Sequence, residues 1–305
     1  KLAEDPKVPR GWSWTLLHRP QDHFLVRNVA WTSDGRCLAA TSEGLAFWDG
    51  SSWLEMVPEG YPEPKGIRLV RKLAPGQWMI GGDGATLAVL REAGKWELRQ
   101  GEDRSVSFVM ASGDPDDLGV AVGEDSEGRL SLHALAAGRW WRPLSLPEVA
   151  SILSVARIED EKWLLAGRRR DGRGYAAVYR PTQWSVEELP SSETRAYLAS
   201  AGDPARGMGL IVGVGGHTLL VERGQIRAEH AGASVDLAAA AFDGTGRAWA
   251  AARGSLWVRS PGGGNPWSCV WSEPSWPSPL VSLVADVGLV VAISVDGAVL
   301  EGRLG

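Results

Sequence analysis

Histidine and cysteine are the residue types in this sequence best suited to metal binding or nucleophilic chemistry. Cys37 and Cys269 lie far apart in the chain, and no two histidines have the spacing of metal ligands on one element. His18 and His23 share a segment with Asp22, the nearest approach to a cluster, and a solvated loop is its simpler interpretation. We therefore predict neither a metal site nor catalytic residues among the five histidines, which are His18, His23, His133, His217 and His230.

Phosphate and calcium loops are also missing as sequence patterns. The chain has no GxSxG motif and no Walker-type loop, and its runs GVGG (213–216) and GGGN (262–265) fit turns between strands. The Asp- and Gly-rich segments 123–128 and 242–246 lack the alternating carboxylates of a calcium loop, so we interpret them as hairpin turns. No cofactor is predicted.

Arginines and two loop aromatics form the main candidate binding set. The run 168–170 carries charges that can grip an acidic peptide or a phosphate group, although such runs more often form solvated loops. Tyr61 and Trp276 lie between prolines, which favours an interface anchor, and the alternative is that each packs over its own structural unit. The candidates are Tyr61, Arg68, Arg104, Arg168, Arg169, Arg170, Arg195 and Trp276.

An internal repeat of about 42 residues would position these side chains. Strand-opening residues recur with separations of 43, 44, 44, 42 and 41 residues at Trp53, Trp96, Trp140, Trp184, Ile226 and Trp267. Apolar second strands begin at residues 37, 78, 119, 163, 209, 249 and 289, with separations of 41, 41, 44, 46, 40 and 40 residues. Two independent series that agree on one period indicate a true repeat.

Each repeat contains four short apolar runs separated by turn signals such as Asp49-Gly50, and no segment has a sustained helical period. Four-stranded antiparallel units of this length are typical of β-propeller blades. We predict an all-β, seven-bladed β-propeller over residues 11–305, after an N-terminal extension at 1–10. The predicted blades span roughly 24–57, 67–100, 106–145, 150–189, 194–230, 235–272, and 280–303 together with 11–17.

Ring closure follows from the last repeat, which supplies three strands and lacks a fourth. The segment 11–17 (GWSWTLL) has the pattern of an outermost strand and precedes the first complete repeat. We predict that it pairs with the strand at 297–303 and covers an edge that would otherwise be exposed. The repeated tryptophans are interpreted as packing residues, because a buried indole removes a large apolar area from water.

The element that ends in WDGSSW resembles the repeats of bacterial regulator propellers and, more distantly, WD-repeat propellers. This resemblance implies a sensory or protein-binding module attached to an effector such as a kinase or an ATPase. A chain that starts at Lys1 fits a piece of a longer protein. We therefore expect a non-catalytic scaffold that binds a protein, a peptide or a neighbouring domain of the same polypeptide, with any catalysis in an attached domain.

The amino-acid composition limits the classes of binding partner and the cellular compartment that we expect. A net charge of −5 argues against nucleic acid as a partner, and the longest apolar run is too short to cross a membrane. Two distant cysteines favour the cytoplasm, while a periplasmic or secreted location stays open. Two alternative functions also stay open. One is a carbohydrate-binding propeller with exposed aromatics, and the other is an enzyme with a central-channel site, for which Asp236 is the acidic candidate.

Overall fold

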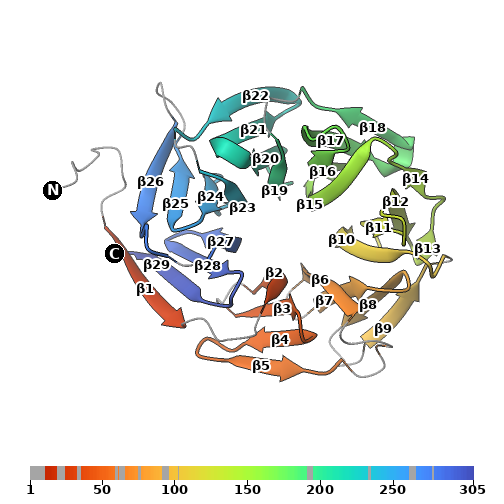
Figure 1. Ribbon diagram of the computed structural model, residues 1–305, viewed down its shortest axis with the longest axis horizontal. Helices are drawn as coiled ribbons and strands as arrows, with labels where there is room; N and C mark the ends of the chain where they lie inside the picture. Colours follow the sequence, from red (N-terminus) through yellow and green to blue (C-terminus); the bar gives the residue numbers. More distant parts are fainter. Residues whose placement is uncertain are drawn as a thin grey trace.

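Seven antiparallel sheets surround a central channel in the computed structural model of the chain (Figure 1). The predicted all-β fold, a seven-bladed β-propeller, is confirmed. The expected N-terminal extension at 1–10 lies outside the described residues. The structure describes residues 11–18, 25–32, 36–58, 61, 66–74, 77–90, 96–101, 103–190, 195–232, 235–260, 266–276 and 278–305.

The strands follow one another from the channel outward in six of the blades. Blade 1 consists of β2 (Val26–Trp31), β3 (Cys37–Thr41), β4 (Leu45–Trp48) and β5 (Trp53–Met56). Blade 2 consists of β6 (Ile67–Ala74), β7 (Gln77–Gly82), β8 (Thr86–Leu90) and β9 (Trp96–Gln100). Blade 3 consists of β10 (Ser107–Asp114), β11 (Leu118–Glu124), β12 (Leu130–Ala136), β13 (Arg139–Trp140) and β14 (Leu144–Ser145). Blade 4 consists of β15 (Val149–Glu159), β16 (Lys162–Arg169), β17 (Gly174–Arg180) and β18 (Ser185–Glu188). Blade 5 consists of β19 (Tyr197–Asp203), β20 (Met208–Gly213), β21 (His217–Glu222) and β22 (Gln225–His230). Blade 6 consists of β23 (Leu237–Phe242), β24 (Ala248–Ala252), β25 (Ser255–Arg259) and β26 (Trp267–Ser272). Within the described residues, a short 3-10 helix η2 (Pro181–Gln183) lies between β17 and β18 of blade 4, and another, η3 (Val214–Gly216), lies between β20 and β21 of blade 5.

Blade 3 departs from the repeat because its outer strand is split. Both β13 and β14 pair with β12. The gap between them contains Pro143, which has no backbone N–H to donate to the ladder.

Blade 7 closes the ring as the sequence predicted. It consists of β27 (Leu280–Asp286), β28 (Leu289–Ser294), β29 (Val299–Leu304) and the N-terminal strand β1 (Trp12–His18). Strand β1 runs antiparallel to β29, with Trp12 opposite Leu304 and Leu16 opposite Leu300. The ladder continues to the end of the chain, where the N–H of Gly305 donates to the carbonyl of Gly11 (2.9 Å). Figure 1 shows β1 beside β29 at the outer edge of the ring.

The hydrophobic core lies between the blades. The buried apolar side chains of the described residues form seven clusters, and each cluster contains residues of two neighbouring blades. Strands β3 and β24 are buried at every position, since both of their faces are covered. The largest fully buried side chains are Trp48, Trp163 and Trp249. Burial between blades therefore fixes the ring as one rigid body around the channel.

The strand-opening tryptophans mostly pack as expected. Trp96 and Trp267 are buried, Trp53 packs on Trp48 with ring centres 5.5 Å apart, and Trp140 stacks on Phe108 at 5.0 Å. Trp184 differs, because it lies before β18 rather than within it and has a left-handed backbone conformation (φ 53°).

Candidate binding face

One face of the ring collects two sets of loops, and we call it the loop face. The loops between second and third strands hydrogen-bond to the loops that join successive blades. The N–H of Ser42 donates to the carbonyl of Leu25 (2.9 Å), and that of Arg170 to the carbonyl of Glu148 (3.0 Å). The same pattern joins Val214 to Ala196 (3.0 Å). These bonds hold the backbone of the loop face in a fixed shape.

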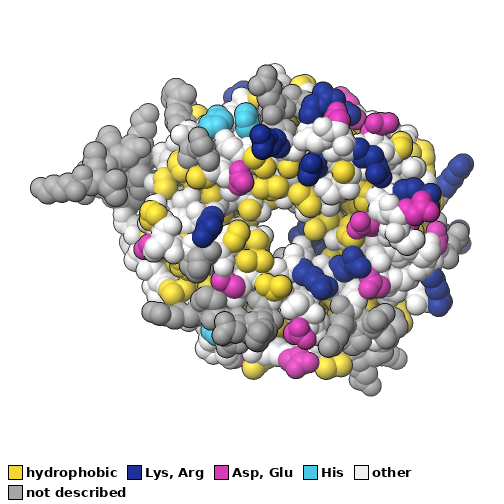
Figure 2. Space-filling model, viewed as in Figure 1, with side chains coloured by type: hydrophobic (Ala, Val, Ile, Leu, Met, Phe, Trp, Pro, Cys, Tyr) yellow, Lys and Arg dark blue, Asp and Glu magenta, His cyan; other side chains and the backbone are white. Residues whose placement is uncertain are grey.

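Figure 2 shows one face of the ring, where hydrophobic side chains border much of the central opening and charged side chains lie around them. Dark blue Lys and Arg side chains lie near the rim of the opening, with magenta Asp and Glu side chains interspersed farther out. A cation that is already paired within the protein has fewer donors left for a binding partner, so the contacts of each predicted arginine determine what it can offer.

The two aromatic candidates are buried, which favours the alternative that each packs over its own structural unit. Tyr61 is 6% exposed and packs in the cluster between blades 1 and 2. Trp276 is 8% exposed and contacts Trp271 edge-on, with ring centres 5.3 Å apart. Burial raises the pKa of the Tyr61 hydroxyl well above its usual range, so the phenol stays neutral. In the absence of a rearrangement, neither ring is available to a partner.

Four of the arginine candidates already have partners. Arg68 forms an ion pair with Asp83 (2.7 Å), which also accepts a hydrogen bond from Ser107 (2.9 Å). Arg104 is exposed and donates to the side-chain oxygen of Gln100 (2.9 Å). Arg169 pairs with Glu188 and lies over the ring of Tyr175, and Arg170 reaches into blade 3.

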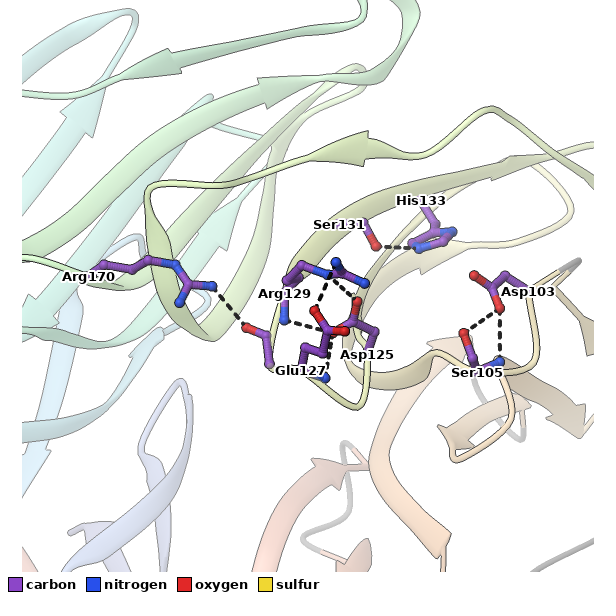
Figure 3. A network of polar contacts seen from close by, with 9 residues as sticks. Asp103, Ser105, Asp125, Glu127, Arg129, Ser131, His133 and Arg170 are labelled. Atoms are coloured by element: carbon purple, nitrogen blue, oxygen red, sulfur yellow. Dashed lines mark hydrogen bonds and ion pairs between the residues drawn. The ribbon is translucent and has the colours of Figure 1, made fainter.

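Arg170 has a structural role that the sequence does not reveal. Its Nε donates to the carbonyl of Pro147 (2.9 Å) and its Nη2 to the carbonyl of Gly128 (3.3 Å), which fastens the blade 4 loop onto blade 3. Figure 3 shows this side chain pointing toward the turn that contains Asp125 and Arg129. In that turn, the carboxylate of Asp125 accepts from the Nε of Arg129 at 2.7 Å.

A serine–histidine pair lies beside the same turn (Figure 3). The Oγ of Ser131 and the Nε2 of His133 are 2.8 Å apart, as in a nucleophile and its base. The His133 ring is buried, however, and packs edge-on against Phe108 with ring centres 5.2 Å apart. Desolvation lowers the pKa of His133 to about 4, so the imidazole is neutral at pH 7. The carboxylate of Asp103 accepts from Ser105, and this arrangement fits packing better than catalysis.

Arg168 and Arg195 are the two predicted arginines that remain available. Both side chains are exposed, and neither has a hydrogen bond or an ion pair among the described residues. Arg168 lies near the end of β16, and Arg195 lies two residues before β19, which packs against β16. Two guanidinium groups therefore project from neighbouring blades of the loop face.

The central channel contains basic residues that the sequence did not single out as a cluster. It has a volume of about 550 Å³, and its lining includes Arg27, Arg71 and Lys72. No Asp, Glu or His is among the described lining residues, so the acid–base pair that a channel enzyme would need is not found there. Asp236 instead accepts a hydrogen bond from the N–H of Gly215 (2.9 Å) and holds a loop. The sequence does contain a signal for this basic cluster, because Arg71 and Lys72 interrupt the apolar run of β6.

Other chemistry finds little support in the described part of the chain. No group of three or more His, Cys, Asp or Glu side chains there could hold a metal ion. None of the 16 tryptophans belongs to the exposed large hydrophobic residues, whereas a lectin-type propeller needs exposed aromatics. Among the described residues, no helix has the length and apolar character to span a membrane.

Comparisons with known proteins identify the fold and no family. Neither the protein-family models nor the curated proteins give a match. The regulator-type repeat therefore stays a prediction.

Among solved structures, the chain is similar to a streptogramin B lyase (TM-score 0.72, 11% identity, 97% of this chain and 98% of that one). It is also similar to virginiamycin B lyase from Staphylococcus aureus (TM-score 0.71, 9% identity, 96% and 99%). A third similar structure is the WD40 β-propeller domain of Doa1 (TM-score 0.68, 13% identity, 95% and 97%). The chain thus shares its whole propeller fold with both lyases and a WD40 domain.

Proposed function

We propose that this propeller is a binding module whose loop face recognises an acidic segment of a partner protein or of a neighbouring domain. The observation that carries the proposal is the pair of exposed arginines on neighbouring blades, Arg168 and Arg195, which lack partners among the described residues. Guanidinium groups form charge-assisted, often bidentate hydrogen bonds with carboxylates and phosphates. The similarity to a WD40 propeller domain is consistent with this role.

The other arginines of the blade 4 loop hold that loop, and with it Arg168, in place. Arg169 and Arg170 use their donors within the protein, and Arg173 is paired with Asp171 (2.6 Å). These contacts hold the loop in one conformation, so a partner would lose little entropy in ordering it. The partner would then meet Arg168 at a fixed position on a rigid platform.

A defined acidic peptide tests this function. We would measure fluorescence anisotropy of a labelled Glu-rich peptide and of its Gln-rich counterpart. The double variant Arg168→Ala/Arg195→Ala should weaken binding of the Glu-rich peptide by roughly fivefold to tenfold, because exposed charge pairs contribute up to about 1 kcal/mol each. Arg173→Ala is the matched control, since Arg173 lies in the same loop and is already paired with Asp171.

Two results would contradict the proposal. One is equal affinity for the Glu-rich and Gln-rich peptides, and the other is an unchanged affinity in the double variant. Thermal unfolding of the double variant should match that of the parent, because both side chains are exposed and neither has a hydrogen bond or an ion pair within the described residues that folding could lose.

A further inference from the structure

The central channel is a cavity of the size that small ligands occupy. Its volume of about 550 Å³ falls within the range of roughly 300–1,000 Å³ that is usual for small-molecule sites. The first strands of the seven blades form its wall, and in Figure 2 the opening lies at the centre of the face. A ligand in the channel would be surrounded by a rigid ring, so the wall is formed before the ligand enters.

Positive charge is concentrated on one side of this wall. Arg27 comes from β2, and Arg71 and Lys72 come from β6 in the neighbouring blade. Arg71 uses its Nε to donate to the carbonyl of Ala111 (2.8 Å), while its two terminal nitrogens have no partner among the described residues. Lys72 makes no hydrogen bond or ion pair with the described residues, and Arg27 has one long bond, from Nη1 to the carbonyl of Ile67 (3.4 Å).

Arg71, the most enclosed of the three cations, lacks the compensation that buried charges normally have. Removing an ion from water is costly unless an opposite charge or hydrogen bonds replace the lost hydration. Burial lowers the pKa of the Arg71 guanidinium, which reflects that cost, although the group stays charged near pH 7. A bound anion would supply the missing acceptors.

Apolar side chains form most of the rest of the wall, and its three serines take part in hydrogen bonds. Asn28 also lines the channel and accepts a hydrogen bond from the N–H of Val70 (3.0 Å). Blades 4 to 7 contribute Leu153, Leu198, Ala238, Ala240, Val281 and Val284. The Oγ of Ser200 donates to the Oγ of Ser154 (3.0 Å), and the indole N–H of Trp31 donates to the Oγ of Ser282 (3.1 Å). The channel therefore offers cationic donors on one side and a mostly apolar surface on the other.

We infer that the central channel binds a small amphiphilic anion, with its carboxylate or phosphate group against Arg27, Arg71 and Lys72 and its apolar body against blades 4 to 7. The site is distinct from Arg168 and Arg195, so this inference does not depend on the function proposed above. It assigns a role to three basic residues that have no carboxylate partner among the described residues.

Three probes separate the two halves of the site. Octanoate has an anionic head and an apolar chain, octanamide has the chain without the charge, and inorganic phosphate has the charge without the chain. Isothermal titration calorimetry at low salt should show one octanoate per chain. Octanamide should bind at least roughly tenfold more weakly, because it cannot form charge-assisted hydrogen bonds with the three cations. Phosphate should also bind at least roughly tenfold more weakly, because it has no apolar chain to bury against blades 4 to 7.

Single substitutions locate the binding. Lys72→Gln should weaken octanoate binding roughly tenfold, and its folding should be unchanged because the Lys72 side chain has no hydrogen bond or ion pair to lose among the described residues. Arg71→Gln should weaken binding by roughly 10- to 100-fold. The hydrogen bond from Arg71 to Ala111 joins blades 2 and 3, so this substitution could also affect folding. The thermal unfolding of Arg71→Gln is therefore measured together with its octanoate affinity. Arg227→Gln is the control, because it removes the same charge from an exposed position on the outer strand β22.

The inference fails on any of three outcomes. These are no measurable octanoate binding, equal affinity for octanamide, or an affinity that Lys72→Gln and Arg227→Gln change to the same extent. A loss of binding that is confined to the channel variants supports it.

Discussion

The carboxylate of Asp243 is the most heavily bonded acidic group of the described residues, and its replacement by asparagine tests how the turns hold the blades. Its Oδ1 accepts from the N–H of Thr245 (2.9 Å), the hydroxyl of Thr245 (2.5 Å) and the N–H of Arg247 (3.0 Å). Its Oδ2 accepts from the Nε of Arg247 (2.8 Å) and from the indole N–H of Trp249 (3.1 Å). The carboxylate is 0% exposed and Trp249 is fully buried.

Asp243→Asn keeps one oxygen and replaces the other with an amide that can only donate. That amide would face the two donors of Arg247 and Trp249, so a buried charge and an indole N–H would lose their acceptor. Breaking a buried ion pair by removing one partner costs about 3–5 kcal/mol, and we expect about 3 kcal/mol because Arg247 retains some contact with water. With an unfolding entropy of about 2.1 cal/mol/K per residue, this loss lowers the Tm by about 5 °C.

Asp125→Asn is the matched control. Asp125 belongs to a turn with the same arrangement, in which Arg129 donates its N–H and its Nε to one carboxylate. That carboxylate is 17% exposed and accepts no bond from a buried indole, so the loss should be clearly smaller than for Asp243→Asn. Urea titration and calorimetry of both variants provide the comparison.

The pH dependence gives a second check on Asp243. Desolvation raises the pKa of this carboxyl group, but the hydrogen bonds from Thr245, Trp249 and Arg247 together outweigh it and leave the pKa below its usual value. The carboxylate therefore stabilises the fold above the pKa of the unfolded chain, and this contribution is lost as the pH falls through the lower folded value. The difference between parent and Asp243→Asn should shrink below about pH 4. Equal losses in the Asp243 and Asp125 variants, or a difference that persists in acid, would refute this reasoning.

Two further predictions concern packing. Desolvation lowers the pKa of His133 to about 4. As the pH falls, His133 binds a proton in the unfolded chain before it does so in the folded chain. The stability of the fold should therefore decrease as the pH falls from about 6.5 to about 4, by up to roughly 3 kcal/mol, and should be constant above about pH 6.5. Urea titrations of His133→Gln should lack this slope, and an identical slope in the variant would contradict the assignment. Gly302→Ala places a Cβ 2.3 Å from the ring of Trp14, so β1 must shift and amide exchange over residues 12–18 should accelerate, whereas Glu301→Ala should leave it unchanged. Protection that is equal in both variants would show that β1 tolerates the extra methyl group.

The architecture could be predicted from the sequence because its signals are local and repeated. Turn dipeptides such as Asp49-Gly50 and the regular spacing of apolar runs mark each strand without knowledge of its neighbours. Ring closure was predictable for a similar reason, since one missing outer strand and one unassigned strand pattern at 11–17 leave a single simple pairing.

The binding residues were harder to predict because partners come from distant segments. Arg170 hydrogen-bonds to Gly128, which lies 42 residues away, and its sequence neighbours do not indicate this contact. Tyr61 and Trp276 lie in loops but fold back onto their blades, so a loop position alone does not imply exposure. Charges within an apolar inner strand, such as Arg71, are the signal that points to the channel.

The meeting of the two strand ends in blade 7 also determines how the ring responds to mechanical force. Gly11 and Gly305 lie at the same end of an antiparallel pair and are joined by one hydrogen bond. A pull between them loads the β1–β29 ladder like a zipper, so its bonds break one after another from Trp12 toward His18 and never share the load. Under tension, the ring would open first at this seam, while the other six blades are still intact.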